Sequence, residues 1–395
     1  MTDVAASLRI SHLATGLTAV LVGYAGTVAI VFQAAAAVGA SQAQLASWLW
    51  ALGIGTGLST LALSLAHRAP VLTAWSTPGA ALLATSLPGL SMAEAVAAFL
   101  FCSFLLTCVG LFGWFDAIVR NLPRSLAAAM LAGVLLRFGL DAFAVLPTEP
   151  VLVLAMLAAW LAGWVWAPRL AVPLLLGVGL LTAVLLGQVD TALIELRLAM
   201  PVWTTPVPSV AALLGVGLPL CLVTLAAQNL PGIAVLRGNG YELRASPLIG
   251  WTGFTGLALG PFGGYAFNLA AITAAICAGP QSDPDPNRRW LSSMSAGGFY
   301  LVAGLMGASV ASVLAALPIA LVALLAGLAL LSTLAGSLAS ALEDAGQREA
   351  AIVTFLVTGS GMAWFGLGSG FWGLVFGLGV HWAGRWRVRG AQDGR

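Results

Sequence analysis

Residues Pro261–Pro280 read PFGGYAFNLAAITAAICAGP and hold the feature that decides the fold. The stretch is apolar enough for a bilayer interior, yet Pro261 and the two glycines after Phe262 oppose a helix at its start. The β-prone run Tyr265–Phe267 comes next, followed by Asn268, a residue type that favours the N-cap of a helix. Good helix formers then continue to the closing glycine and proline. The pattern predicts a short extended piece followed by a half-helix.

A break of this kind at membrane depth has a physical consequence. Lipid offers no hydrogen bonds, so irregular backbone is tolerated there only where protein buries it or where it lines a cavity. The first amide groups of a helix that begins in mid-membrane are free, and the helix dipole makes that end positive. We therefore expect the start of this half-helix to attract an anion.

A second stretch, Ala69–Gly89, repeats the pattern with the sequence APVLTAWSTPGAALLATSLPG. Pro70 precedes a β-prone run, Val71–Trp75, and a helix-forming run follows. Thr77 before a proline is a strong helix-start signal, so we expect Thr77 to be the N-cap of a second half-helix.

Composition places the whole chain in a membrane. Of its 395 residues, 60% are hydrophobic and only 8% are charged, where a soluble domain carries about 25% charged residues. The mean hydropathy is +1.00. All 16 basic residues are arginines and they are scattered, which excludes a nucleic-acid-binding surface. The sequence predicts an all-α polytopic membrane protein with no large soluble domain.

Fourteen apolar segments can be drawn along the chain. Their expected bounds are His12–Val38, Gln44–Ala66, Ala69–Gly89, Glu94–Ile118, Ser125–Leu140, Pro150–Val165, Val172–Gly187, Ser209–Leu236, Ser246–Leu259, Pro261–Pro280, Trp290–Leu314, Pro318–Leu342, Ala350–Trp364 and Leu367–Trp382. With both termini in the cytoplasm, fourteen of the 16 arginines fall on the cytoplasmic side and only Arg137 and Arg197 fall outside. This supports the count of fourteen and a cytoplasmic position for both ends.

The broken segments are the third and the tenth, which occupy equivalent places in two halves of seven. Residues 1–190 form the first predicted repeat, 191–208 a polar linker, and 209–395 the second repeat. Because seven is odd, the two halves must be inverted in the membrane. Paired interrupted segments in inverted halves indicate the midplane binding site of a transporter.

The candidate site is therefore built around the two breaks. If the half-helices meet start to start, they provide a positive, amide-rich floor, and we expect Tyr265 and Phe267 to lie on one side of an extended run. Aromatic walls over such a floor suit an aromatic carboxylate. Buried amides and a tyrosine in the first and eighth segments could complete it. Helix packing explains Gln33 and Tyr24 about as well, but it explains the adjacent pair Gln228 and Asn229 less well. The predicted substrate-binding residues are Tyr24, Gln33, Trp75, Ser76, Thr77, Gln228, Asn229, Tyr265, Phe267 and Asn268.

Other functions have weaker support. No metal-ligand spacing, nucleotide motif or nucleophile–base pair lies at membrane depth, so we expect no metal, no cofactor and no enzyme activity. No acidic residue sits at the centre of a segment, and His12, His67 and His381 all lie near segment ends. The proton-coupling residue is not identifiable, and the substrate carboxylate could itself carry the proton. An anion channel is a further alternative, because paired half-helices also line pores.

The stretch Pro261–Pro280, followed by DPDPNRRW (283–290), resembles the signature of the bacterial benzoate/H+ symporter family, the BenE-like proteins. That family is similar in architecture to nucleobase–cation symporters and anion exchangers with a seven-plus-seven inverted repeat. The resemblance implies a core domain from segments 1–4 and 8–11, a gate domain from segments 5–7 and 12–14, and substrate between segments 3 and 10. It also implies proton-coupled uptake by alternating access across the bacterial inner membrane, and homodimers through the gate domain.

One departure from the related nucleobase carriers bears on the substrate. Those carriers use acidic residues on segments eight and ten, where this chain has Gln228, Asn229 and Asn268. An acidic wall would repel an anion, so the amides fit an aromatic carboxylate such as benzoate. A nucleobase or inorganic-anion transporter of the same fold is the main alternative.

Overall fold

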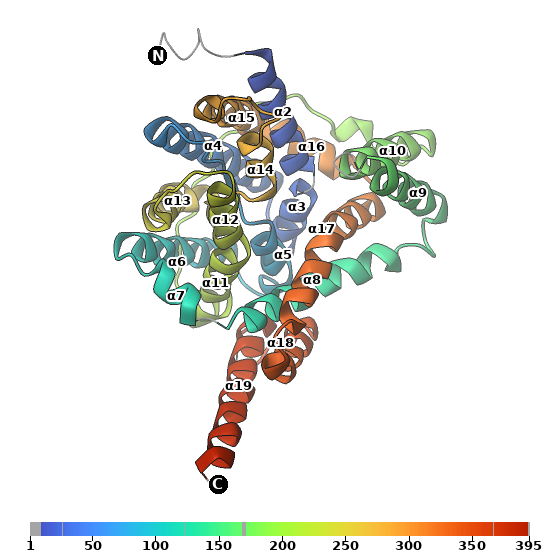
Figure 1. Cartoon of the computed structure of the whole chain (residues 1–395). Coiled ribbons are helices and arrows are strands. Elements are labelled where there is room, and N and C mark those ends of the chain that lie inside the picture. The colour runs from blue at the N-terminus through green and yellow to red at the C-terminus, as the bar shows by residue number, and fades with distance from the viewer. Residues whose placement is uncertain (1–8, 26, 122, 168–170, 366, 394–395) are drawn as a thin grey trace.

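The chain folds into a helical bundle around one short pair of strands (Figure 1). A computed structural model describes residues 9–25, 27–121, 123–167, 171–365 and 367–393. In the first half the elements are α2 (Ile10–Ala25), α3 (Val28–Ala37), α4 (Gln42–His67), β1 (Thr73–Trp75), α5 (Thr77–Ser86), α6 (Met92–Leu111), α7 (Phe115–Asn121), α8 (Arg124–Ala144), α9 (Pro150–Trp166) and α10 (Ala171–Leu185). Apart from the short α7, these helices and β1 lie in the first seven predicted segments.

The second half follows a linker that contains the short turn η2 (Thr191–Leu193). Its elements are η3 (Ala211–Gly217), α11 (Leu218–Thr224), η4 (Leu225–Asn229), α12 (Leu230–Gly238), α13 (Ala245–Leu259), η5 (Gly260–Phe262), β2 (Phe267–Leu269), α14 (Ile272–Ala278), η6 (Pro286–Arg288), α15 (Trp290–Leu305), α16 (Gly307–Ala316), α17 (Ile319–Leu342), η7 (Ala345–Gln347), α18 (Arg348–Gly359) and α19 (Ser369–Asp393). The expected eighth segment is thus one nearly continuous helix, with π-helical turns at η3 and η4.

Six helices in the described part of the chain are long and apolar enough to cross a membrane, and a seventh is added if α15 and α16 count as one span. Those two helices are bent by 63° at Met306. The fourteen predicted segments do not all meet this length criterion, because segments 3 and 10 are broken and several others form helices of fewer than 18 residues. The fourth segment also ends earlier than expected, at Leu111, and α7 follows as a separate helix after a turn at Gly113.

Helix packing pairs the two halves with each other. Helix α4 packs on α15, α6 packs on α13, and α8 packs on α17. Two of these crossings depend on facing glycines, since a Cβ on Gly53 would overlap the backbone of Gly304, and a Cβ on Gly110 would overlap that of Gly250. Small residues let the helix backbones approach closely where lipid gives no hydrophobic drive for association.

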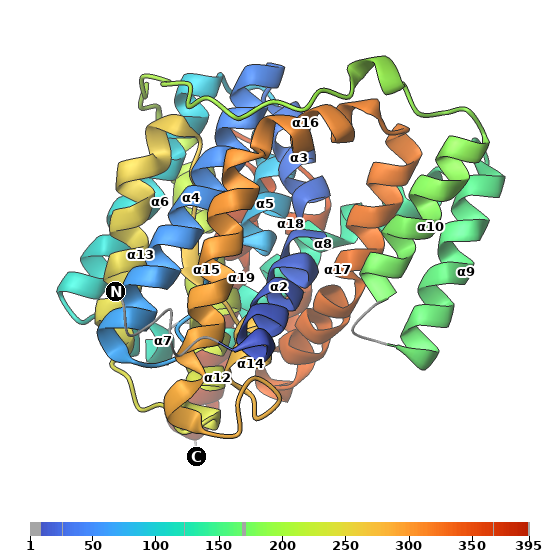
Figure 2. The same cartoon turned by 90° about the horizontal axis from the view of Figure 1, so that it is seen from above.

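The helices form two groups (Figures 1 and 2). In one group the strand pair contacts α4, α13 and η4, while α9 and α10 lie at the far side of α17. The linker crosses one end of the bundle between α10 and η3, as Figure 2 shows where the chain passes α16. Three backbone hydrogen bonds attach the linker to the bundle. The N–H of Ala199 donates to the carbonyl of Leu305, that of Thr204 to Pro261 and that of Val207 to Ala93.

Arg169, one of the arginines predicted on the cytoplasmic side, lies outside the described residues, as do residues 1–8 and the last two residues. The cytoplasmic position of both termini therefore stays a prediction.

Candidate functional site

The two broken segments meet directly, because β1 and β2 pair with each other as antiparallel strands. Thr73 lies opposite Leu269, Ala74 opposite Asn268 and Trp75 opposite Phe267. Two further backbone bonds extend the ladder at its ends: the N–H of Ser76 donates to Ala266, and that of Ala270 donates to Leu72. The extended backbone predicted at both breaks is therefore present. Inside the bundle, each strand supplies hydrogen-bond partners for the backbone of the other.

Side chains from two neighbouring helices accept hydrogen bonds from backbone N–H groups at the outer edges of this ladder. The N–H of Thr73 donates to the Oγ1 of Thr60 on α4, 3.0 Å away. On the other edge, the N–H of Leu269 donates to the Oδ1 of Asn229 at 3.0 Å. An unpaired amide would cost about 1–3 kcal/mol in a buried site, so Thr60 and Asn229 stabilise irregular backbone in the core of the bundle.

The first half-helix, α5, begins one residue earlier than predicted. Its N-cap is Ser76, whose Oγ accepts the N–H of Gly79 at 3.0 Å. The expectation that Thr77 caps the helix is wrong, and Thr77 is its first residue with Pro78 second. The cap shifts because Ser76 is still extended and its own N–H completes the strand ladder. Thr77 is half-buried beside this helix start.

The prediction that Asn268 caps the second half-helix is also wrong. Asn268 lies in the middle of β2, fully buried, and its Nδ2 donates to the carbonyl of Ala266 at 2.9 Å. Strand pairing holds this part of the chain extended through Ala270, so α14 begins only at Ile272. The preceding residue, Ala271, offers no side-chain cap.

The two helix starts lie at opposite ends of the ladder. Helix α5 follows Trp75 at one end, and α14 follows Leu269 at the other, so the strands separate the two positive ends. The expectation that the half-helices meet start to start is therefore wrong, because each helix begins only where its own strand ends. Each start retains backbone N–H groups that no earlier turn of its helix can bond. At α14 one side of the first turn is open, since Ile272 is 71% exposed.

Trp75 is the centre of an aromatic cluster next to the ladder. Its ring makes edge-to-face contacts with Tyr24 of α2, at 5.5 Å between centroids, and with Tyr300 of α15, at 5.9 Å. Thr273 and Gly23 lie beside the same cluster, because a Cβ on Gly23 would touch the Tyr300 hydroxyl and the Thr273 methyl. Two predicted residues, Tyr24 and Trp75, are thus brought together, while Tyr300 was not predicted.

Tyr265 and Phe267 do not form the shared wall that the sequence predicts. Tyr265 precedes β2 and packs on Trp48 and Phe99, with centroids 6.0 and 5.5 Å away. The alternation of faces fails because the intervening Ala266 has a φ of +42°. Phe267 packs instead against α4 and α13, where Gly55 and Gly256 leave room for its ring. Both side chains are fully buried packing residues.

The two predicted glutamines lie outside the strand ladder. Gln33 on α3 is half-buried, and its Nε2 lies 3.4 Å from the carbonyl of Val322 on α17. Gln228 is half-buried in η4 and makes no side-chain hydrogen bond within the described residues. Gln33 therefore links α3 to α17 rather than bordering the strands.

Several buried polar atoms around the ladder have no hydrogen-bond partner among the described residues. Two are pure donors, the Nε1 of Trp75 and the Nδ2 of Asn229. The hydroxyls of Tyr24 and Thr224 and the Oδ1 of Asn268 are also unpaired. Native proteins rarely leave such groups unmatched, so each requires an explanation such as a ligand. Unpaired donors are suited to a ligand that brings acceptors, as a carboxylate does.

The described residues contain no group of three or more histidine, cysteine, aspartate or glutamate side chains that could hold a metal ion. The four cysteines are free thiols.

The fold resembles solved anion-transporter structures. The transmembrane domain of the cyanobacterium bicarbonate transporter BicA matches 93% of this chain and 97% of that domain, with a TM-score of 0.61 and 16% identity. At this identity the match shows the fold alone.

Sequence comparisons give a closer relationship. The inner membrane protein YdcO of Escherichia coli is 50% identical over 365 residues, which cover 92% of this chain and 93% of that protein. The benzoate membrane transport protein of Acinetobacter baylyi is 37% identical over 369 residues, which cover 93% and 94% of the two chains. A family model for the benzoate membrane transport protein matches residues 6–383. Because the family model and this relative both cover most of the sequence, the chain belongs to the family of benzoate membrane transport proteins.

Proposed function

We propose that this protein is a secondary transporter that takes up benzoate, or a closely similar aromatic carboxylate, together with a proton across a bacterial inner membrane. Family membership supports transport, and the name of the Acinetobacter baylyi relative supports benzoate as the substrate. The Escherichia coli relative, named an inner membrane protein, supports the location. The arginine distribution supports cytoplasmic termini.

The single observation that carries the substrate proposal is the set of unpaired donors at the ladder. The Nε1 of Trp75 and the Nδ2 of Asn229 are buried and lack acceptors. A carboxylate offers only acceptors, and the positive helix starts next to the strands favour its charge. The Trp75 ring, together with Tyr24, gives an aromatic ligand an edge-to-face partner. In this proposal Thr77, Gln228 and Asn268 border the substrate, while Gln33 ties the adjacent helix to α17.

We further propose an inverted repeat of seven plus seven segments. Its support is the symmetric packing. Exchanging each segment for its counterpart in the other half turns the α4–α15 pair into the α13–α6 pair, and both pairs are packed. It also turns the α9–α10 pair into α18–α19 and maps the β1–β2 and α8–α17 pairs onto themselves. In this proposal segments 1–4 and 8–11 form a core domain that carries the substrate, and it moves against a gate domain of segments 5–7 and 12–14. A homodimer through the gate domain is part of the same proposal.

Uptake into proteoliposomes tests this function. With an inward proton gradient, we expect saturable accumulation of radiolabelled benzoate that a protonophore abolishes, and no accumulation in protein-free liposomes. An unlabelled aromatic carboxylate should compete, whereas a nucleobase should not. Absence of benzoate uptake alongside robust uptake of bicarbonate or uracil would overturn the substrate assignment. Bicarbonate is the second candidate because the fold matches that of BicA. Unitary currents in place of accumulation would indicate a channel.

A further inference from the structure

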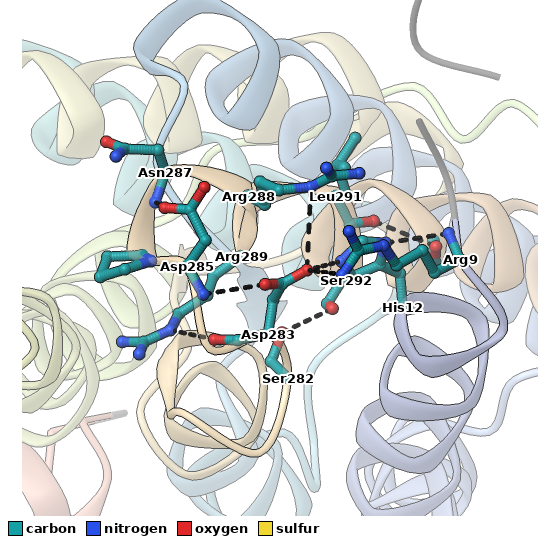
Figure 3. A network of polar contacts seen from close by, with 12 residues as sticks. Arg9, His12, Ser282, Asp283, Asp285, Asn287, Arg288, Arg289, Leu291 and Ser292 are labelled. Carbon is teal, nitrogen blue, oxygen red and sulfur yellow. Dashed lines mark hydrogen bonds and ion pairs between the residues drawn. The ribbon is translucent and has the colours of Figure 1, made fainter. Parts of the chain in front are cut away.

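A compact cluster of charged side chains surrounds Asp283, where the loop between α14 and α15 meets the start of α2 (Figure 3). The Nε2 of His12 lies 2.9 Å from the Oδ2 of Asp283. The guanidinium groups of Arg9 and Arg288 lie 3.6 and 3.8 Å from the same oxygen. Among the described residues, Asp285, Arg289 and Tyr241 also donate hydrogen bonds to this loop, Tyr241 through the η6 backbone. We call this set the His12–Asp283 cluster.

Burial sets this cluster apart from every other charged group in the described chain. Of the described acidic, arginine and histidine side chains, only three are buried: His12 at 0% exposure, Asp283 at 3% and Arg289 at 8%. Burying ionisable groups is costly unless they are paired and hydrogen-bonded, so a buried cluster of this kind is a candidate functional site. The cluster also lacks a counterpart in the first half, because the equivalent loop between α5 and α6, residues 87–91, contains no ionisable residue. It therefore provides a titratable site in only one half of the fold.

The hydrogen bonds define how His12 can take up a proton. The backbone N–H of Arg9 donates to the Nδ1 of His12 at 3.1 Å, so Nδ1 is an acceptor and the ring is neutral with its proton on Nε2. That Nε2–H donates to Asp283. A second proton must bind at Nδ1, which breaks the bond to Arg9 and releases the first turn of α2. The bond to Asp283 is kept and becomes charge-assisted.

Asp283 itself is held in its charged form. The backbone N–H of Asp285, the His12 ring and the Arg9 guanidinium hold the pKa of the Asp283 carboxyl below its usual range, although burial opposes them. Because this pKa is lowered, the carboxylate stays ionised at neutral pH and loses its charge only in acid. Within the pair, the Nδ1 of His12 is therefore the atom that can accept a further proton while the carboxylate keeps its charge.

Two helices connect the cluster to the candidate substrate site. Helix α2 carries His12 at its start and Tyr24, the ring partner of Trp75, twelve residues later, about 18 Å along the helix axis. Helix α14 ends at the cluster, where the Nη1 of Arg289 donates to the carbonyl of Ala278 at 3.0 Å, and it begins at the strand ladder. The two helices also pack on each other. A change at His12 can therefore shift both sides of the substrate site.

We propose that His12, held against Asp283, binds the proton that is transported with the substrate. The proposal rests on the proposed function and assigns the coupling residue within it. The proton binds Nδ1 in place of the Arg9 N–H, and the bond from Arg9 reforms when the proton leaves. Because substrate and proton bind in the same state, each must strengthen the binding of the other.

A transport experiment separates proton coupling from a structural role. In proteoliposomes, we expect His12→Gln to lose at least about tenfold in gradient-driven benzoate accumulation, because glutamine can donate to Asp283 but cannot take up a proton. The same variant should retain benzoate counterflow, which needs no net proton movement. His67→Gln, at an exposed histidine, is the matched control and should keep both activities.

Either of two results would overturn the proposal: full gradient-driven accumulation by His12→Gln, or loss of accumulation and counterflow together in a folded variant. If wild-type protein neither accumulates nor exchanges benzoate, the proposed function itself fails, which is a separate outcome.

A second measurement tests the proposal even if the His12→Gln variant does not fold. The chain has three histidines, so His67→Gln with His381→Gln leaves His12 as the sole histidine. Its ring can be ¹³C-labelled and titrated by NMR in nanodiscs. Saturating benzoate should raise the titration midpoint of His12 by at least about 0.5 pH units, which corresponds to about threefold tighter proton binding when benzoate is bound. An unchanged midpoint would contradict the proposal.

Discussion

Trp75→Ala is expected to reduce proton-driven benzoate uptake by at least about tenfold while the protein still folds. The substitution removes the ring that contacts Tyr24 and Tyr300, and such edge-to-face pairs are worth about 0.5–1.5 kcal/mol each. It also removes an unpaired buried donor, the Trp75 Nε1, that the proposal assigns to the carboxylate. A hydrogen bond to a charged group is worth about 1.5–3 kcal/mol, so loss of this donor alone exceeds the roughly 1.4 kcal/mol that corresponds to a tenfold change in affinity. Initial rates over a range of benzoate concentrations measure the effect.

Two control variants refine this test. Trp75→Phe keeps a ring against Tyr24 but lacks the N–H, so its uptake should fall between that of wild type and Trp75→Ala. Trp251→Ala removes a tryptophan that is 57% exposed on α13 and should transport normally. Normal uptake by Trp75→Ala, with wild-type affinity, would place the substrate away from the ladder.

Asn229→Leu is expected to lower both stability and transport. Leucine cannot accept the N–H of Leu269, so a buried amide at the edge of β2 loses its partner at a cost of about 1–3 kcal/mol. The ladder then shifts or loosens, and the start of α14 moves with it. We expect a fall of several degrees in the melting temperature of the purified protein and a loss of most benzoate uptake.

The neighbouring residue offers a matched control. Gln228→Leu makes the same change of amide to alkyl at a half-buried side chain with no hydrogen bond in the described chain. Its melting temperature should stay close to that of wild type. Equal destabilisation by both variants would show that the Asn229–Leu269 bond does not stabilise the ladder.

The sequence predicted both breaks because local residue preferences set them. Proline, β-prone residues and a hydroxyl side chain before a proline located α5 to within one residue. The prediction failed at Asn268, whose preference for an N-cap is outweighed by pairing with Ala74 on a strand far away in the chain. It failed for the shared face of Tyr265 and Phe267 because Ala266 adopts a left-handed conformation that alternation rules do not anticipate.

Other site residues were beyond the reach of local patterns. Tyr300 lies in an uninterrupted helix, and only tertiary packing brings it to Trp75. His12 looked like an interfacial residue near a segment end, yet it is fully buried against Asp283, 271 positions further along the chain. Charge patterns along a sequence do not show which ends fold together, so such pairs become visible only in three dimensions.

The central claim is that the paired breaks of segments 3 and 10 form the substrate site. A cryo-electron microscopy structure of the protein with benzoate bound tests it most directly. The account predicts an antiparallel β1–β2 pair with the benzoate carboxylate within hydrogen-bond distance of donors at the ladder, and its ring within about 4.5–7 Å of the Trp75 ring centroid. Benzoate bound away from the strands, or continuous helices in place of the two breaks, would contradict it.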